Sequence, residues 1–181
     1  VWFGLTVFII PYREDVKTTY AHPGKGVMNG VEALIREGIL PPLDEQAKVL
    51  ETGSNQGSNL LALQEKFGCS VVGVDISRAA LDVAENKVWK GRRNYDFRQA
   101  NVLTTELDRA LGEEVFDLAF TFWHLVHLPR IEEKKRYLEI LKKRSRVLVI
   151  MEPVREGRTG EIELSHDSSY CLSFDDWVGE Y

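Results

Sequence analysis

The 181-residue sequence is poor in cysteine and has no excess of basic residues. Its two cysteines, Cys69 and Cys171, form no C-x-x-C pair, which indicates a reducing compartment and argues against a disulfide framework. The formal net charge is −5, so we expect no nucleic-acid partner. Lysines and arginines gather between positions 134 and 146, and we interpret this cluster as the solvated face of a helix.

The apolar run at positions 1–10 is too short to span a bilayer, and it lacks the basic leader and small-residue cleavage site of a signal peptide. We interpret it as a strand or a helix that packs against the core. We therefore expect a cytoplasmic protein without a membrane partner. The sequence does not begin with Met, which leaves open that it is a fragment of a longer chain.

Two signatures of nucleotide binding are missing. The G-x-G-x-x-G fingerprint is absent because Asn55 stands where its middle glycine would be, and no Gly-Lys-Ser/Thr follows. The sequence has instead a G-x-x-x-G loop from Gly53 to Gly57, between a short apolar run and a helical pattern at 58–67. Glycine permits positive φ and a close approach of the backbone to a ligand. A purely structural strand-to-helix turn is the alternative for this loop alone.

A second apolar run at 70–75 ends in Asp75, about 20 residues after the loop. Nucleotide-binding α/β folds place a carboxylate there that accepts hydrogen bonds from both ribose hydroxyls, since a carboxylate only accepts. The alternative is an Asp that caps the next helix, beside Ser77.

Strand and helix patterns alternate at least four times along the chain. This predicts an α/β fold with a doubly wound, mainly parallel sheet and helices on both faces. Ligands in such sheets bind beyond the carboxyl ends of the strands. Polar residues occur at or just beyond five predicted strand ends: Glu51, Asp75, Asn101, Thr121 and Glu152. They predict one crevice lined by successive loops.

Five segments in this order resemble the class I S-adenosylmethionine-dependent methyltransferases: VLETGSNQGSN, VVGVD, QANVL, FDLAFTFWHLVHL and VLVIMEP. The resemblance implies a Rossmann-like fold and S-adenosylmethionine as cofactor, with S-adenosylhomocysteine as product. The resemblance covers about 47–153, and we expect a cofactor-binding core at 46–153. The N-terminal extension at 1–45 contains a helical pattern at 27–37 that either caps the pocket or covers one edge of the sheet. We expect the tail at 154–181 to face the substrate. The family's closing antiparallel hairpin is not evident, so the sheet either lacks it or is completed otherwise, for instance by residues 1–10.

The resemblance also assigns cofactor-binding roles. The methionine part would be held by Glu51 and the backbone of the loop, namely Gly53, Ser54, Asn55 and Gly57. Asp75 would bind the ribose, with Ile76 against the adenine and Asn101 and Val102 at its edge. The segment closing over the methionine part and facing the acceptor would be Thr121, Phe122 and Trp123.

A general base is needed only where the acceptor is a hydroxyl or a protonated amine. His124 and His127 are the first candidates, because the pKa of histidine lies near working pH. The alternative is a partly buried pair satisfied by backbone groups. The remaining candidates are Glu152, His22, His166 and Tyr20. No third ligand accompanies the two histidines, so we expect no metal.

A narrower resemblance concerns the acceptor. The loop E-x-G-x-N-x-G-x-N-L, and the tail with Ser165-His166-Asp167 and 174–180, are similar to methyltransferases associated with pseudaminic (nonulosonic) acid biosynthesis. We therefore expect methyl transfer to a small-molecule acceptor, with a sugar or nonulosonic acid derivative as one option. A non-catalytic adenosyl-binding partner or regulatory module is the alternative. An aminopropyl transferase is disfavoured by the lack of extra acids after the fourth strand, and a nicotinamide oxidoreductase by the glycine spacing.

Overall fold

The computed structural model describes residues 6–9, 24–128, 130–151, 162–164 and 169–171. Its strands in chain order are β1 (Thr6–Ile9), β2 (Lys48–Thr52), β3 (Ser70–Asp75), β4 (Tyr95–Gln99), β5 (Phe116–Phe122), β6 (Ser145–Met151), β7 (Ile162–Leu164) and β8 (Ser169–Cys171). Its α-helices are α1 (Lys25–Arg36), α2 (Ser58–Phe67), α3 (Arg78–Val83), α4 (Glu106–Leu111) and α5 (Ile131–Arg144). A π-helical turn, η2 (Ala84–Val88), continues α3, and a 3₁₀ turn, η3 (Leu125–His127), follows β5.

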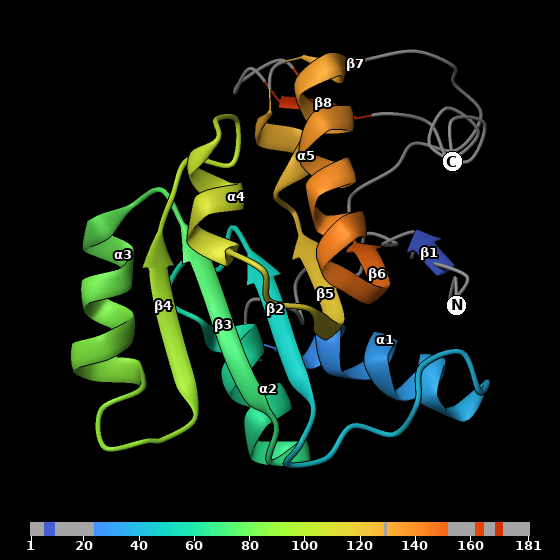
Figure 1. The fold of residues 1–181 in the computed structure, drawn as a ribbon, viewed down its shortest axis with the longest axis vertical. Coiled ribbons are helices and arrows are strands. Elements are labelled where there is room, and N and C mark those ends of the chain that lie inside the picture. Colours follow the sequence, from blue (N-terminus) through green and yellow to red (C-terminus); the bar gives the residue numbers. More distant parts are fainter. Residues whose placement is uncertain (1–5, 10–23, 129, 152–161, 165–168, 172–181) are drawn as a thin grey trace.

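Within the described residues, six strands form one sheet in the order β1-β6-β5-β2-β3-β4, and every neighbouring pair is parallel. The chain winds outward from β2 through β3 to β4, then returns to β5 on the other side of β2 and continues to β6 (Figure 1). This reversal between β2 and β5 is the point at which doubly wound sheets bind ligands. The predicted α/β fold is confirmed.

Helices cover both faces of the sheet, and each face has its own core. On one face, apolar residues of α1, α2 and α3 pack with alternate strand residues such as Val49, Val71 and Phe120. On the other face, α4 and α5 pack over the intervening strand residues, such as Leu50, Val72 and Ala119 (Figure 1). Burial on both faces explains why the strands are almost continuously apolar and do not alternate with polar residues.

The N-terminal apolar run supplies an edge strand. β1 lies parallel to β6, with Thr6 opposite Val147 and Ile9 opposite Ile150. This confirms the strand option for positions 6–9, the part of that run that the structure describes, and these residues extend the sheet at its edge. β7 and β8 form a separate antiparallel pair outside the main sheet.

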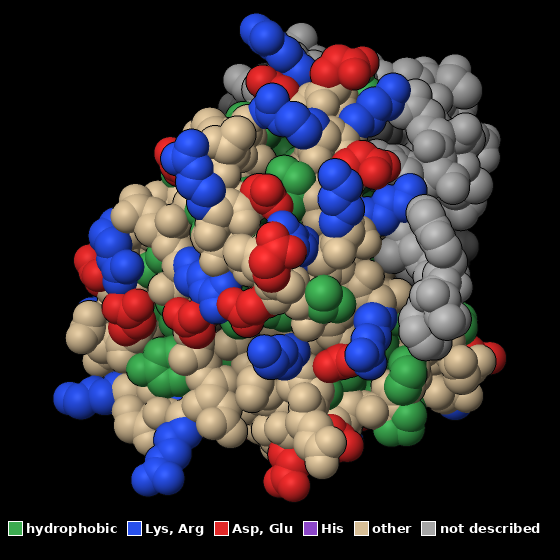
Figure 2. Space-filling view, viewed as in Figure 1, with side chains coloured by type: hydrophobic (Ala, Val, Ile, Leu, Met, Phe, Trp, Pro, Cys, Tyr) green, Lys and Arg blue, Asp and Glu red, His purple; other side chains and the backbone are tan. Residues whose placement is uncertain are grey.

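One detail of the helices differs from the prediction. The cluster of basic residues is not wholly solvated, because Lys134 is buried at the start of α5. The other polar side chains of this side of the molecule mix both signs of charge over α4 and α5 (Figure 2). No helix in the described part of the chain has the length and apolar character that crossing a membrane requires.

Candidate functional site

The loop after β2 is folded back onto the end of β3. The backbone N–H groups of Gly53 and Ser54 both donate to the carbonyl of Val74, at 2.8 and 3.1 Å. Gly53 and Gly57 each have φ of 72°, a left-handed conformation that glycine adopts without strain. Asn55, which replaces the expected middle glycine, also has positive φ, and Asn is one of the few other residues that tolerate it. The loop geometry is therefore kept despite the sequence variation.

Packing behind the loop is a second reason for its glycines. A Cβ on Gly57 would lie 2.5 Å from the Phe97 ring and 2.7 Å from Nε1 of Trp89. A Cβ on Gly53 would overlap the imidazole of His124. Phe97, Trp89 and Tyr95 form an aromatic cluster with ring centroids 5.1 to 5.6 Å apart. Neither glycine position thus has room for a side chain, whatever ligand the loop meets.

Asp75 joins the loop to the next helix. Its Oδ2 accepts from the backbone N–H of Asn55 and its Oδ1 accepts from that of Ser77, both at 2.8 Å. The Ser77 hydroxyl in turn accepts from the N–H of Ala80 and caps α3. Asp75 thus helps to order the helix start, as the capping alternative suggested. Each carboxylate oxygen still has a second lone pair, so the half-buried side chain keeps the capacity to accept from hydroxyl groups.

Glu51 was predicted at the strand end, but β2 continues one residue further, to Thr52, so Glu51 lies within the strand and its side chain is buried. Its exposed fraction is 1%, and Oε1 accepts a hydrogen bond of 2.7 Å from Nδ2 of Asn59 on α2. Its other oxygen, Oε2, is buried without a hydrogen-bond partner in the described part of the chain. Burial raises the pKa of Glu51 from 4.5 to about 8, the Asn59 bond opposes this rise, and the negative charge of Asp75 adds to it. At neutral pH the carboxyl is mainly protonated.

A second buried polar group lies beside Glu51. Gly73 is the cross-strand partner of Glu51, and a Cβ on Gly73 would come within 2.8 Å of the Ser54 hydroxyl. Ser54 is 4% exposed, and its buried hydroxyl has no hydrogen-bond partner among the described residues. Buried polar atoms without partners are uncommon in folded proteins, and they point to a group that the bare chain does not supply.

The end of β5 lies beside the end of β2, on the side away from β3, and His124 after it packs against Gly53 of the loop. Thr121 of β5 lies opposite Thr52 of β2. The Trp123 N–H donates to the carbonyl of Met151 at 2.9 Å. Trp123 has φ of 52°, which is uncommon for a bulky residue, and its ring stacks on Phe122 with centroids 6.4 Å apart. This backbone turn directs the chain from the strand into His124 and η3.

His124 and His127 are not a buried pair. The His124 ring packs against Gly53 and makes an edge contact with Tyr137, with centroids 5.8 Å apart. Burial lowers the pKa of His124 to about 4, the charge of Asp75 opposes this shift, and that of His127 adds to it. His127 is exposed on η3. Only His124 thus lies against the glycine loop, and it is neutral at physiological pH.

The predicted adenine-side residues lie at the ends of β3 and β4. Ile76 is 62% exposed, an unusual position for a large apolar side chain, and Nε2 of Gln99 donates to its carbonyl at 3.0 Å. Asn101 is half-buried and its Oδ1 accepts from the N–H of Leu103 at 2.9 Å, which orders the turn. The Val102 side chain is in the core, so only its backbone is available to a ligand.

Three residues near the loop, Thr52, Asn59 and Tyr137, are not among the site residues predicted from the sequence. Asn59 holds Glu51, and its position in the E-x-G-x-N-x-G-x-N run is a signal that could have marked it. Tyr137 of α5 is fully buried and hydrogen-bonds the hydroxyl of Thr52. No local pattern in the sequence marks this contact, because its partners are 85 residues apart.

Other predicted base candidates, Glu152, His22, His166 and Tyr20, lie outside the described residues, as does the tail at 172–181. Within the part of the chain that the structure describes, no group of three or more His, Cys, Asp or Glu side chains is arranged to hold a metal ion.

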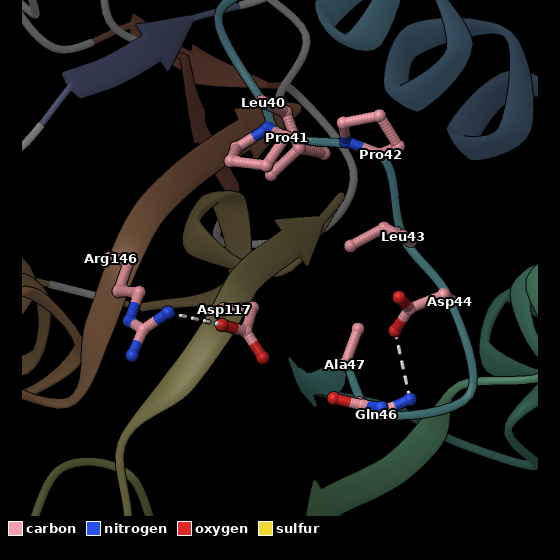
Figure 3. Close-up of a pocket in the computed structure, with 9 residues that line it drawn as sticks. All are labelled: Leu40, Pro41, Pro42, Leu43, Asp44, Gln46, Ala47, Asp117 and Arg146. Carbon is pink, nitrogen blue, oxygen red and sulfur yellow. Dashed lines mark hydrogen bonds and ion pairs between the residues drawn. The ribbon is translucent and has the colours of Figure 1, made fainter.

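A cavity of about 340 Å³ lies at the opposite edge of the sheet (Figure 3). The segment Leu40–Leu43 lines one side, and Asp117 and Arg146, near the amino ends of β5 and β6, line the other. Asp117 is already paired there, since it accepts from Arg146 at 3.0 Å and from the Lys48 N–H at 2.9 Å. The charged groups that line this cavity thus satisfy one another, whereas Glu51 and Ser54 at the glycine loop have buried atoms without partners in the described part of the chain.

Comparison with known proteins agrees with this geometry. Residues 49–148 match the methyltransferase domain family. Phosphoethanolamine N-methyltransferase of Plasmodium falciparum is 29% identical over 100 residues, which cover 55% of this chain and 36% of that protein. The chain thus spans little more than a third of the length of this relative.

Two solved structures share the fold. YjhP of E. coli has a TM-score of 0.60 at 15% identity, with 86% of this chain and 62% of that chain covered. The [4+2]-cyclase SpnF has a TM-score of 0.61 at 18% identity, with 86% and 56% covered. Since the family match spans more than half of the chain and includes the glycine loop, Asp75 and β5, the chain belongs to the class I S-adenosylmethionine-dependent methyltransferases.

Proposed function

We propose that this chain binds S-adenosylmethionine at the carboxyl edge of β2, β3 and β5 and transfers its methyl group to a small-molecule acceptor. The observation that carries the proposal is the convergence of four groups from separate elements: the glycine loop, Glu51, Asp75 and His124. Glu51 and Ser54 present buried polar atoms without partners in the described part of the chain, and both lie at this loop.

The donor set fits the chemistry of this cofactor. An adenosyl ligand presents two ribose hydroxyls, an apolar base face and a charged amino-acid end. Asp75 offers carboxylate lone pairs to the hydroxyls, Ile76 offers an exposed apolar side chain to the base, and the acid Glu51 lies at the loop assigned to the ammonium. Asn101 and the Val102 backbone would border the base, and Thr121 to Trp123 would close over the methionine part.

The cofactor supplies a methyl group that is already activated by its sulfonium centre. The work left to the chain is to hold donor and acceptor in line and to exclude water, which contributes up to about 7–11 kcal/mol in well-oriented intramolecular reactions. The fixed loop and the buried Thr52–Tyr137 contact supply that rigidity. His124 is neutral, so its imidazole can accept a hydrogen bond from an acceptor hydroxyl or amine. A pKa of about 4 leaves it little driving force to take the proton fully.

For the acceptor we propose a small molecule with a hydroxyl, amine or thiol, a sugar or nonulosonic acid derivative being the first class to test. The loop motif and the tail around His166 support the sugar. The name of the Plasmodium relative, a phosphoethanolamine N-methyltransferase, supports an amine.

The experiment is an assay of methyl release from S-adenosylmethionine over sugars, thiols and amines. We expect turnover with one class, a large loss for His124→Gln, and little change for His127→Gln, whose side chain is exposed. Equal rates for both variants would remove His124 from the reaction. Cofactor binding without turnover on any acceptor would favour the non-catalytic adenosyl-binding module.

A further inference from the structure

The side chain of Glu51 is held in a setting that disfavours a negative charge. It is 1% exposed, and the one hydrogen bond to its carboxyl in the described residues comes from the neutral amide of Asn59. No Lys, Arg or His of the described chain forms an ion pair with it. A buried carboxylate with one neutral donor and a second unpartnered oxygen is costly, and such a group keeps its proton.

Asp75 is the titratable group whose charge acts on Glu51, and the neutral amide of Asn59 is what α2 presents to it. On β3, Asp75 adds a negative charge that disfavours ionisation of Glu51. After β5, His124 lies against the neighbouring Gly53 and is neutral, and the exposed His127 follows it. On the opposite face of the sheet, Tyr137 of α5 bonds Thr52, the next residue of β2, and the buried Lys134 lies one turn earlier on that helix.

We propose that binding of S-adenosylmethionine or S-adenosylhomocysteine at the glycine loop releases a proton from Glu51. This inference rests on the proposed cofactor site. The Glu51 carboxyl has no cationic partner among the described residues, and the ammonium of the ligand would supply one. A nearby positive charge favours the ionised form of a carboxyl. Glu51 then serves as the charge partner of the ligand only in the complex.

The O–H bond of the Glu51 carboxyl breaks, its electron pair stays on the carboxylate, and the proton goes to solvent. The ligand ammonium keeps its three protons. The charge of the protein falls by one, and this offsets the positive charge that the ammonium brings into the site.

Isothermal titration calorimetry tests the inference on the whole chain. S-adenosylhomocysteine is titrated at pH 7 in buffers of different ionisation enthalpy, and the slope of the observed enthalpy against the buffer enthalpy counts the protons released. Because the pKa of Glu51 is about 8, we expect about 0.9 proton per ligand. A count of zero overturns the inference.

A second ligand controls for the adenosyl part. 5′-Methylthioadenosine keeps the adenosine and the sulfur but lacks the amino-acid end, so it should bind without releasing the proton. Equal proton release by both ligands would contradict the role of the ammonium. This comparison uses only the wild-type chain and so does not depend on how a variant folds.

The variant Glu51→Gln keeps an acceptor for Asn59 and removes the titrating group. The affinity of the wild type for S-adenosylhomocysteine should rise about tenfold from pH 6 to pH 7, since deprotonation of Glu51 opposes binding below its pKa. The affinity of Glu51→Gln should be flat over this range. His127, Lys134 and Tyr137 are present in both proteins, so their contributions cancel in the comparison.

The outcomes separate the two proposals. No binding of S-adenosylhomocysteine to the wild type would refute the cofactor site itself. Binding with the same proton count and the same pH dependence in the wild type and in Glu51→Gln would leave the cofactor site standing and refute the proton release.

Discussion

Replacing Glu51 with Gln should remove the fall in the free energy of unfolding that the wild type shows between pH 6 and pH 8. The folded protein holds the Glu51 proton with a pKa of about 8, against an ordinary value of 4.5. Between these values the folded state binds a proton that the unfolded state has lost, so the free energy of unfolding falls as the pH rises. From pH 6 to pH 8 this loss sums to about 2 kcal/mol in the wild type.

The assay is urea unfolding at pH steps from 6 to 8, followed by fluorescence of the four tryptophans. Glu51→Gln should lack this loss, since the amide is close in shape to the protonated carboxyl and does not titrate. Glu65→Gln, a change in an exposed carboxylate of α2, should keep the slope of the wild type. Equal slopes in the wild type and Glu51→Gln would refute the buried, protonated carboxyl.

Three further predictions concern the loop, the helix cap and His124. Gly53→Ala should destabilise the protein by about 1–3 kcal/mol more than Gly38→Ala, as measured by urea unfolding, because both glycines have φ of 72° but only Gly53 faces the His124 ring. Ser77→Ala should lower the unfolding free energy by about 1 kcal/mol through loss of the α3 cap, and an unchanged value would contradict the Ala80 bond. NMR titration should find the His124 ring neutral down to about pH 4, so its contribution to stability is present above pH 6.5 and is lost as the pH falls towards 4; an ordinary pKa near 6.5 would show that the ring is not buried.

The sequence predicts the elements of this fold well, because its strands and helices are locally encoded. Both α2 and β3 have the predicted bounds, since Gly57 and Gly68 delimit the helix and an apolar run defines the strand. No local sequence pattern marks the π-helical turn after Val83, which ends at the fully buried Trp89, whose backbone N–H donates to the carbonyl of Ala84. Strand β1 was expected only as a strand or a helix, because a short apolar run is compatible with both.

The candidate site was predicted by position more than by environment. Ligands in parallel sheets bind beyond the carboxyl ends of the strands, and this placed the loop, Asp75 and the residues after β5 at the same edge of the sheet. Position along the strands does not indicate how deeply each side chain is buried. It did not indicate that Glu51 is protonated, that His124 is neutral while His127 is exposed, or that Lys134 is buried. These properties depend on helices α2 and α5, whose contacts with the strand ends are set by tertiary packing.

The most direct test of the cofactor site is calorimetric titration of S-adenosylhomocysteine into the wild type, Asp75→Ala and Asp82→Ala. Asp82 is an exposed acid of α3 paired with Arg78, so its removal matches the change in charge but lies away from the loop. We predict that Asp82→Ala binds as the wild type does and that Asp75→Ala loses about tenfold or more in affinity, the value of one or two charge-assisted hydrogen bonds. Equal affinity in all three proteins, or no binding in any of them, would contradict the proposed site.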